Sequence, residues 1–382
     1  MNVHSFSPDI PKRMRIAHLT SAHPRDDIRI FYKQCRSLVA GGYDVTLVVA
    51  DGLGDGLREG VNILDVGRDQ GRLQRMLKTT SRMFKKSVWL DADLYHFHDP
   101  ELIPVGLRLK RLGKCVIFDA HEDVPKQLLG KPYLTPFILK ILSRGFSILE
   151  QYACARLSGI IAATPTIREK FLAINPKTVD VNNYPIIGEL DAGLPWTAKS
   201  PEVCYVGSIA GIRGIREIVR AIELVNQPAT LSLVGAFAEL DVENEVRGYR
   251  GWQRVNALGI QDRRGVREAL GRAVAGLVTL HPVVNYLDAL PIKMFEYMAA
   301  GIPVIASDFP LWREIVEGNG CGICVDPLNP KEISAAIECL LRDRELAEEM
   351  GAKGARAVRD RFNWGAEEKK LLKFYDNIFA DI

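Results

Sequence analysis

The sequence lacks features typical of secreted, membrane-spanning and nucleic-acid-binding chains. Its seven cysteines are odd in number and scattered, which is not a disulfide framework and predicts reduced thiols in a cytosolic protein. Cys321 and Cys324 have the spacing of a metal or redox motif, but no second pair or histidine cluster accompanies them in the sequence. We interpret them as the start of an apolar strand. A net charge of only +3 gives no reason to expect a nucleic-acid partner.

A leader pattern and a membrane anchor are also missing. Residues 1–13 contain no apolar core of the kind found in signal peptides. No apolar run approaches the roughly 20 residues that span a bilayer. We therefore expect a flexible tail over 1–13, a first domain that starts at Met14, and a cytoplasmic protein.

The dinucleotide fingerprint G-x-G-x-x-G is absent, which argues against NAD, and we expect no cofactor. The chain instead has a G-x3-G-x2-G turn at Gly207, Gly211 and Gly214, which also contains Ser208 and Arg213. Glycines let backbone amides approach phosphate oxygens, and an arginine can bind a pyrophosphate with two hydrogen bonds. The turn is therefore a candidate phosphate site, with a simple tight turn as the alternative.

Apolar runs alternate with amphipathic stretches along most of the chain, which predicts an α/β protein with parallel, doubly wound sheets. The 382 residues suffice for two domains that each bury a core. A segment rich in proline, glycine and polar residues, 186–200, predicts a linker. We expect one domain over 14–185, a second over 201–362, and an amphipathic helix over 363–382.

The expected strands lie at 15–20, 44–50, 61–66, 94–98, 115–120, 159–163, 202–206, 230–234, 255–258, 276–280 and 303–306. The expected helices lie at 28–40, 71–88, 101–112, 134–156, 214–225, 262–275, 291–298, 330–342 and 344–361.

The stretch 279–309 is the most informative part of the chain. It predicts a strand, a polar loop, a helix that starts at Pro291 and stops at Gly301, and a second strand. The free amides and dipole at the helix start favour a pyrophosphate. The residues concerned are Leu290, Pro291, Ile292 and Lys293, of which the lysine adds a full charge. Asp288 and Glu296 can accept hydrogen bonds from hydroxyl groups. A buried helix with two surface acids is the alternative.

The run from Asp288 through Glu296 to YMAAGIPVI resembles the Glu-x7-Glu signature of retaining GT-B glycosyltransferases of the family 4 class, with aspartate in place of the first glutamate. The resemblance extends over nearly the whole chain. It implies two Rossmann-like, doubly wound domains that face each other across a cleft, with the last helix crossing back to the first domain. It also implies that Glu296 binds the nucleotide ribose and Asp288 the donor sugar.

The same resemblance implies sugar transfer from a UDP- or GDP-linked donor to a hydroxyl of a glycan or lipid-linked acceptor. Retention would occur without a covalent intermediate, and without a metal because Arg213 and Lys293 supply its charge. Ser208 stands where family members usually carry arginine, and Arg213 where they carry lysine. His121 matches the histidine that lines the acceptor side. We expect the base to pack near Leu258 and Ile260.

Other acceptor-side candidates follow strand ends. His98 and the pair His121 and Glu122 come after the strands at 94–98 and 115–120, where a histidine beside acids can orient or exchange a proton. For His98 a structural hydrogen bond is the alternative. We expect no metal here, because neighbours along a strand point to opposite faces.

The loop after the first strand reads HPRDDIR instead of the family's usual glycine-rich sequence. Asp26, Asp27 and Arg29 are candidates for binding acceptor hydroxyls or phosphate. Alternatively, Asp27 only caps the helix at 28–40.

Residues 70–90 carry six cations and no acid among apolar side chains, and 134–144 form a second basic, apolar segment. Basic amphipathic helices are typical of membrane surfaces. We predict peripheral contact with an anionic membrane, at its inner face, through 72–90 and 134–144. A solvated basic face over a buried stripe is the alternative.

Two other functions remain open. A nucleotide-sugar 2-epimerase would consume donor without an acceptor. A non-catalytic subunit would bind sugar nucleotides without turnover.

Overall fold

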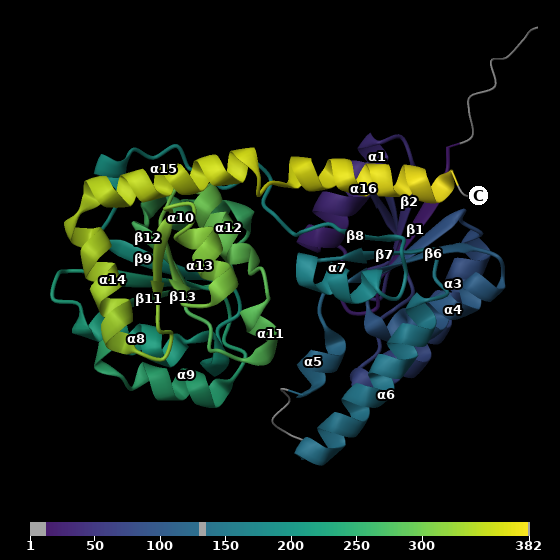
Figure 1. Cartoon of the computed structure of the whole chain (residues 1–382), viewed down its shortest axis with the longest axis horizontal. Coiled ribbons are helices and arrows are strands. Elements are labelled where there is room, and N and C mark those ends of the chain that lie inside the picture. The colour runs from purple at the N-terminus through teal and green to yellow at the C-terminus, as the bar shows by residue number, and fades with distance from the viewer. Residues whose placement is uncertain (1–12, 130–134, 381–382) are drawn as a thin grey trace, which may run out of the picture. The chain divides into compact units, whose positions relative to one another are not determined.

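The computed structural model describes residues 13–129 and 135–380, so the first twelve residues of the expected tail and Leu134 lie outside the described parts (Figure 1). Contacts divide the chain into two compact units. The first comprises residues 1–182 and 368–382, and the second residues 183–367. The end of the chain therefore belongs to the same unit as its beginning.

An eight-stranded sheet forms the centre of the first unit, in the order β3-β4-β2-β1-β5-β6-β7-β8. Neighbouring strands pair in parallel, except that β3 runs antiparallel to β4. The inner strands β5 and β7 are buried at every position, as expected for a parallel sheet covered on both faces. The strands are β1 (Arg15–Leu19), β2 (Asp44–Val49), β3 (Gly56–Arg58), β4 (Val61–Asp65), β5 (Leu94–Phe97), β6 (Cys115–Ala120), β7 (Gly159–Ala162) and β8 (Thr178–Asp180).

Two helices of the first unit start at side-chain caps. Asp27 accepts hydrogen bonds from the backbone amides of Arg29 and Ile30 at the start of η1, and Thr164 accepts one from Ile167 N at the start of α7. The α-helices are α1 (Arg36–Ala40), α2 (Arg72–Gln74), α3 (Thr80–Leu90), α4 (Ile103–Arg111), α5 (Val124–Leu129), α6 (Pro136–Cys154) and α7 (Pro165–Leu172). Residues Ile28–Cys35 (η1) and Arg75–Thr79 (η2) are π-helical, and Pro100–Leu102 (η3) is a 3₁₀ turn.

The second unit has a fully parallel sheet of six strands, in the order β11-β10-β9-β12-β13-β14. Apolar side chains of α10, α12 and α13 form one core cluster, and those of α8, α9 and α14 form the other. The strands are β9 (Glu202–Val206), β10 (Thr230–Val234), β11 (Val255–Gly259), β12 (Ala275–Val278), β13 (Val304–Ser307) and β14 (Gly322–Val325).

The helices of the second unit alternate with these strands. The α-helices are α8 (Ile215–Leu224), α9 (Leu240–Arg247), α10 (Arg263–Arg272), α11 (Val284–Leu287), α12 (Ile292–Ala299), α13 (Pro310–Val316), α14 (Pro330–Arg342) and α15 (Arg344–Asp360). Shorter 3₁₀ turns are η4 (Trp196–Ala198), η5 (Gly211–Arg213) and η6 (Arg250–Arg254). The last helix, α16 (Trp364–Phe379), starts in the second unit and continues into the first.

The predicted fold class is confirmed: both sheets are of the parallel α/β type. The sequence missed β3 and β8, which are three residues long, and the helices α5, α7, α9, α11 and α13, of which α11 lies in the stretch expected to be a polar loop. All residues of β3 are exposed, so no apolar pattern could reveal it. Cys321 is buried just before β14, and its Sγ lies 3.3 Å from the Val316 carbonyl oxygen.

Three buried histidines connect α16 to the first sheet. His18 on β1, His96 on β5 and His98 just after β5 are all at most 2% exposed. The hydroxyl of Tyr375 on α16 lies 2.6 Å from His96 Nδ1 and 3.3 Å from His18 Nε2, and His18 Nδ1 lies 2.9 Å from His98 Nε2. Burial is the main cause that lowers the pKa of all three imidazoles, that of His98 to about 3. The folded protein therefore holds them neutral.

This network predicts acid sensitivity. The unfolded chain binds protons at these histidines near their ordinary pKa of 6.5, whereas the folded protein does not. The free energy of unfolding should therefore fall as the pH drops below 6.5, by about 1.4 kcal/mol per pH unit for each histidine. His23, whose pKa is raised, opposes this only in part. We expect His96→Gln to lose less thermal stability than the wild type between pH 7 and 5. An equal loss in both proteins would contradict this account.

Candidate active site

A glycine-rich loop after β9 opens the candidate donor site in the second unit. Gly207 and Gly214 have φ values of 114° and 81°, which favour glycine. A Cβ on Gly214 would lie 2.1 Å from the Thr279 carbonyl oxygen. The loop therefore packs against the end of β12 only because this position has no side chain.

Lys293, in the first turn of α12, places its ammonium next to this loop. A Cβ built on Gly207 would lie 3.3 Å from Lys293 Nζ, and Nζ lies 3.6 Å from the centre of the Tyr205 ring. Nζ is buried and has no hydrogen-bond partner among the described residues. Burial and the nearby Arg213 lower the pKa of Lys293 well below its usual range. Glu296 raises this pKa, but by less than burial and Arg213 lower it. Burial therefore disfavours the charged ammonium in the empty site, and a bound anion would favour it.

Arg213 brings a second cation to the same place. Its Nη1 donates to the Ser208 carbonyl oxygen at 3.1 Å, and the Tyr205 hydroxyl donates to the same oxygen at 2.8 Å. Burial lowers the pKa of Arg213, but Tyr205 and Tyr286 more than offset this, so the pKa is raised. The structure thus brings Arg213 and Lys293 to the loop that contains Gly207, Ser208 and Gly211, and two basic side chains suit a diphosphate. The predicted amide donors are not free, because Gly207 N donates to the Val234 carbonyl oxygen and Gly211 N to Glu239 Oε2, both at 2.8 Å.

The helix α12 is fixed to the sheet by residues that the sequence did not single out. The Tyr297 hydroxyl accepts a hydrogen bond from Val206 N at 2.9 Å, and a Cβ on Gly276 would collide with the Tyr297 ring. Trp312 Nε1 donates to the Ala289 carbonyl oxygen at 2.7 Å and holds the loop before α12. These contacts fix the direction of the helix that carries Lys293.

The start of α12 differs by one residue from the prediction. Pro291 is the N-cap, and Ile292 is the first helical residue. Gly301 has a φ of 70° beyond the last turn, as a helix stop requires. Leu290 and Ile292 are half-buried, and the exposed Asp288 directly follows α11.

Glu296 lies on the next turn of α12 and is 6% exposed. Its Oε1 accepts a hydrogen bond from Arg263 Nη1 at 2.6 Å. Arg263 also binds Glu189 with two hydrogen bonds, of 2.8 and 2.7 Å. The sequence analysis missed Arg263 and Glu189, because only the fold brings these three residues together.

The residues proposed for base packing lie at the edge strand of the second sheet. Leu258 is on β11 and packs partly against the core, whereas Ile260 follows β11 and is 80% exposed.

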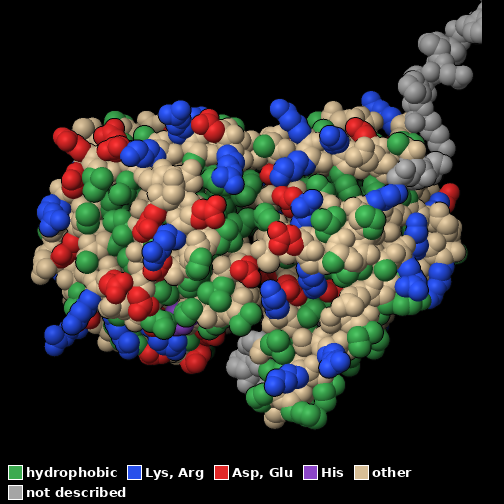
Figure 2. Space-filling model, in the orientation of Figure 1, with side chains coloured by type: hydrophobic (Ala, Val, Ile, Leu, Met, Phe, Trp, Pro, Cys, Tyr) green, Lys and Arg blue, Asp and Glu red, His purple; other side chains and the backbone are tan. Residues whose placement is uncertain are grey.

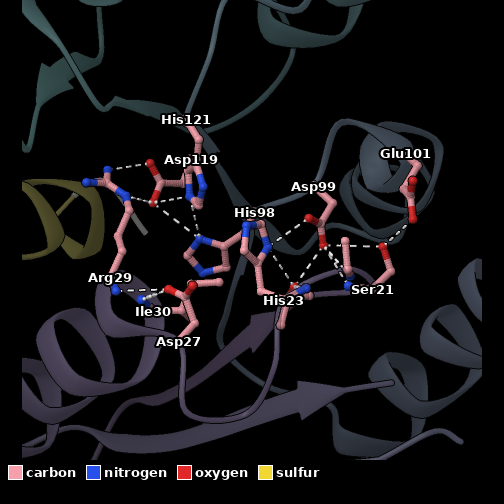
Figure 3. Close-up of polar contacts among 12 residues, drawn as sticks. Ser21, His23, Asp27, Arg29, Ile30, His98, Asp99, Glu101, Asp119 and His121 are labelled. Atoms are coloured by element: carbon pink, nitrogen blue, oxygen red, sulfur yellow. Dashed lines mark hydrogen bonds and ion pairs between the residues drawn. The ribbon is translucent and has the colours of Figure 1, made fainter. Parts of the chain in front are cut away.

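In the first unit Asp119, at the end of β6, is the centre of a buried polar cluster (Figure 3). Arg29 donates to its carboxylate through Nε at 3.0 Å and Nη2 at 2.7 Å, and Gln34 Nε2 donates to Oδ2 at 2.8 Å. His98 Nδ1 and His121 Nε2 each lie 3.2 Å from Oδ2. Although burial raises the pKa of Asp119, Arg29 and His121 lower it far more, and Asp119 is therefore an anion.

The acceptor-side candidates differ in what they can still bind. Arg29 is 4% exposed and also donates to the Val181 carbonyl oxygen, so its guanidinium positions Asp119. Asp27 is the cap of η1, as the alternative interpretation held. His121 keeps 21% of its side chain exposed, and Asp26 and Glu122 are exposed, the latter bonded to Gln127.

A second buried carboxylate, Asp99, is linked to this cluster through His23. Asp99 follows β5 and contacts Thr20, Ser21 and His23, with His23 Nδ1 3.0 Å from Oδ1. The rings of His23 and His121 are 5.2 Å apart. Figure 3 shows His23, Asp99 and Ser21 in one row beside His98.

The expectation that the strand-end residues point apart was wrong. His98 Nδ1 and His121 Nε2 are 3.3 Å apart, and with Asp119 they form a group that could hold a metal ion; His18, His96 and His98 form another. Residues two apart on a strand share a face, which explains the clustering. Arg29 and Gln34 already donate to the Asp119 oxygen that such an ion would need, so the geometry favours a hydrogen-bonded cluster.

Two models of known glycosyltransferase families match the two parts of the chain. The model "Glycosyltransferase Family 4" matches residues 29–182, and "Glycosyl transferases group 1" matches residues 187–357. The chain belongs to the group 1 glycosyltransferases. Within this family it is 24% identical over 320 residues to a phosphatidyl-myo-inositol mannosyltransferase of Mycobacterium leprae, covering 80% of this chain and 79% of that one.

Solved structures show the same GT-B glycosyltransferase fold. Sucrose-phosphate synthase from Thermosynechococcus elongatus superposes with a TM-score of 0.77 at 19% identity, over 97% of this chain and all of that one. Anabaena HepE in complex with UDP-glucose superposes with a TM-score of 0.73 at 14% identity, over 96% and 100% of the two chains.

The buried Nζ of Lys293 leads to a testable prediction about the thermal stability of this glycosyltransferase. Lys293→Met should raise the thermal midpoint without ligand by about 2–4 °C, the shift that about 1 kcal/mol produces in a domain of this size. The difference in thermal midpoint between variant and wild type should shrink as the pH rises towards 10.5. Near that pH Lys293 loses its proton in the unfolded wild type as well, so folding no longer has to remove it. Differential scanning calorimetry checks this, with the exposed Lys331→Met as control. A midpoint lower than that of the wild type would mean that Lys293 stabilises the empty protein.

Proposed function

We propose that this glycosyltransferase is a retaining, metal-independent enzyme that moves a sugar from a UDP- or GDP-linked donor to a hydroxyl group. The observation that carries the proposal is the pair of cations, Arg213 and Lys293, beside the glycine-rich loop. The buried Nζ has no partner among the described residues, and a diphosphate would supply the missing charge. The UDP-glucose named with HepE supports this donor class.

The proposed reaction follows from these charges. The bond between the sugar's anomeric carbon and the diphosphate oxygen breaks, and the acceptor oxygen forms its bond on the same face. The acceptor proton passes to the departing diphosphate. Arg213 and Lys293 stabilise the charge that builds on the leaving group. Glu296 would hold the ribose, Asp288 the donor sugar, and His121 the reacting hydroxyl.

We propose a lipid-linked or other glycan precursor in cell-surface glycan synthesis as the acceptor, and a cytoplasmic protein at the inner face of the membrane. The mannosyltransferase relative is named for a phospholipid substrate, which supports this choice. Among the described residues no helix has the length and apolarity to cross a bilayer.

The structure changes which residues would make that contact. Arg75 pairs with Glu101 and Arg82 with Asp69, so two of the six cations at 72–86 are neutralised by acids from outside the segment. Apolar side chains are instead exposed on α2, η2, α3 and α6. Figure 2 shows hydrophobic and basic side chains side by side at the projecting end of α6. The exposed apolar residues include Leu73, Leu77, Val88, Trp89, Phe137, Ile138, Ile141, Leu142 and Ile148.

A product assay tests the proposed reaction. UDP-glucose, UDP-N-acetylglucosamine and GDP-mannose are incubated with the protein, with and without a lipid-linked acceptor mixture and with EDTA. Transfer that needs the acceptor, survives EDTA and retains the anomeric configuration by NMR supports the proposal. A changed sugar without acceptor would indicate the epimerase, and binding without turnover of any donor would indicate a binding subunit.

Arg213→Ala should weaken UDP or GDP binding by about 10- to 100-fold, the loss expected for a hydrogen bond to a charged group, and turnover should fall further. Uridine or guanosine binding should change little, because neither has a phosphate. Calorimetric titration measures both, with Arg220→Ala, a surface arginine bonded to Tyr249, as control. Equal losses for nucleoside and nucleoside diphosphate would remove Arg213 from the phosphate site.

The membrane contact is tested by flotation with phosphatidylglycerol vesicles. Phe137→Ser with Ile141→Ser should abolish flotation, because each fully buried apolar side chain contributes about 1.5–3 kcal/mol. Lys78→Gln with Lys86→Gln should weaken it only at low salt, by about 1 kcal/mol per charge. Leu240→Ser with Leu328→Ser, exposed in the second unit, is the control. If the wild-type protein does not float with the vesicles, this membrane contact is excluded.

A further inference from the structure

Arg263 joins two acids from different parts of the second unit. It is the first residue of α10, whose N-cap Asp262 accepts from Gly265 N at 2.8 Å. Its Nε and Nη2 donate to the two carboxylate oxygens of Glu189, and its Nη1 donates to Glu296 Oε1. Glu189 lies in a turn closed by its own backbone hydrogen bond to Ile186. All three residues are therefore held at the backbone by local structure.

The geometry fixes the orientation of Glu296. A guanidinium bound through two parallel hydrogen bonds has a defined plane, so Glu189 determines where Arg263 Nη1 points. Nη1 then holds one oxygen of Glu296, at 2.6 Å. Among the described residues Arg263 is the donor to Glu296, and it contacts Oε1 and not Oε2. The carboxylate cannot rotate without breaking this bond.

The charges of Glu189, Arg263 and Glu296 also determine how strongly Glu296 can accept hydrogen bonds. Two acids and one arginine leave a net charge of −1. If Arg263 had only Glu296 as partner, it would neutralise the carboxylate fully. Because Glu189 takes two of the three hydrogen bonds, Glu296 keeps the negative character that makes a carboxylate a strong hydrogen-bond acceptor.

We propose that Arg263 is a positioning residue for the donor, which with Glu189 holds Glu296 so that Oε2 is directed to the ribose hydroxyls of a nucleoside diphosphate. This inference rests on the proposed donor class. It assigns no contact between Arg263 and the sugar itself. Discrimination in favour of a ribose with free hydroxyls thus depends on a residue that does not touch it.

The test measures ribose discrimination directly. Calorimetric titrations use UDP and GDP, each paired with its 2′,3′-dideoxy analogue, on wild type, Arg263→Gln, Arg263→Lys and Glu189→Gln. The control is Arg264→Gln, the adjacent arginine of α10, which forms an exposed ion pair with Glu268.

The wild type should prefer UDP or GDP over its dideoxy analogue by about 10- to 100-fold, as expected for hydrogen bonds to a charged acceptor. Arg263→Gln should reduce this preference to less than about threefold, because Glu296 is no longer oriented. Arg263→Lys should restore part of it, since lysine supplies charge without the planar fork. Glu189→Gln should give an intermediate value, and Arg264→Gln the wild-type value. Donor KM should rise in Arg263→Gln while kcat changes by less than about threefold.

Three results would overturn the inference. If Arg263→Gln weakens UDP and its dideoxy analogue equally, Arg263 only stabilises the unit. If Arg263→Gln tightens binding, Arg263 competes with the ribose for Glu296. In both cases UDP or GDP still binds the wild type, so the proposed function stands. If the wild type binds neither UDP nor GDP, the proposed donor class is wrong, and this assignment of Arg263 is wrong with it.

Discussion

Parallel strand pairing determines where every candidate residue of this glycosyltransferase lies. In each sheet the parallel strands end at the same edge, so loops distant in sequence meet there. In the first unit the ends of β1, β5 and β6 supply His23, Asp99 and His121. In the second, the loop after β9 packs on Thr279, which follows β12. A slip in the register of one strand would move its whole loop and separate these groups.

The two units differ in whether their buried ionisable side chains have partners. Asp119 receives hydrogen bonds from Arg29 and Gln34 and lies against two histidines, so its negative charge is compensated before any ligand arrives. The Nζ of Lys293 is buried without a hydrogen-bond partner among the described residues, and burial and Arg213 lower its pKa. A buried group that must lose its proton or stay unpaired on folding lowers stability, whereas a paired charge avoids most of that cost. The second unit therefore sacrifices stability at the place where an anion would relieve the repulsion, as functional sites commonly do.

Much of this organisation could be predicted from the sequence, because local signals carry it. Proline and glycine at either end of α12 reveal the helix, and the glycine spacing after β9 reveals the loop that Lys293 approaches. Nothing in the local sequence marks Asp119 as the partner of Arg29, 90 residues away. The pairing of Arg75 with Glu101 likewise made a stretch without acids less basic than it looked. Such long-range pairs depend on the sheet order, which periodicity alone does not give.

Long-range pairs also set the orientation of side chains that are close together in the sequence. Glu296 is close in sequence to Lys293, but its orientation depends on Arg263 and Glu189, which lie 33 and 107 positions earlier in the sequence. A ligand that engaged both the ammonium of Lys293 and the carboxylate of Glu296 would connect groups one helical turn apart on α12. Because Tyr297 and Trp312 fix this helix and the loop before it, the separation between a cation and an anion is set before binding. The proposed donor, which carries a diphosphate and a ribose, would therefore have to match a separation that this helix fixes in advance.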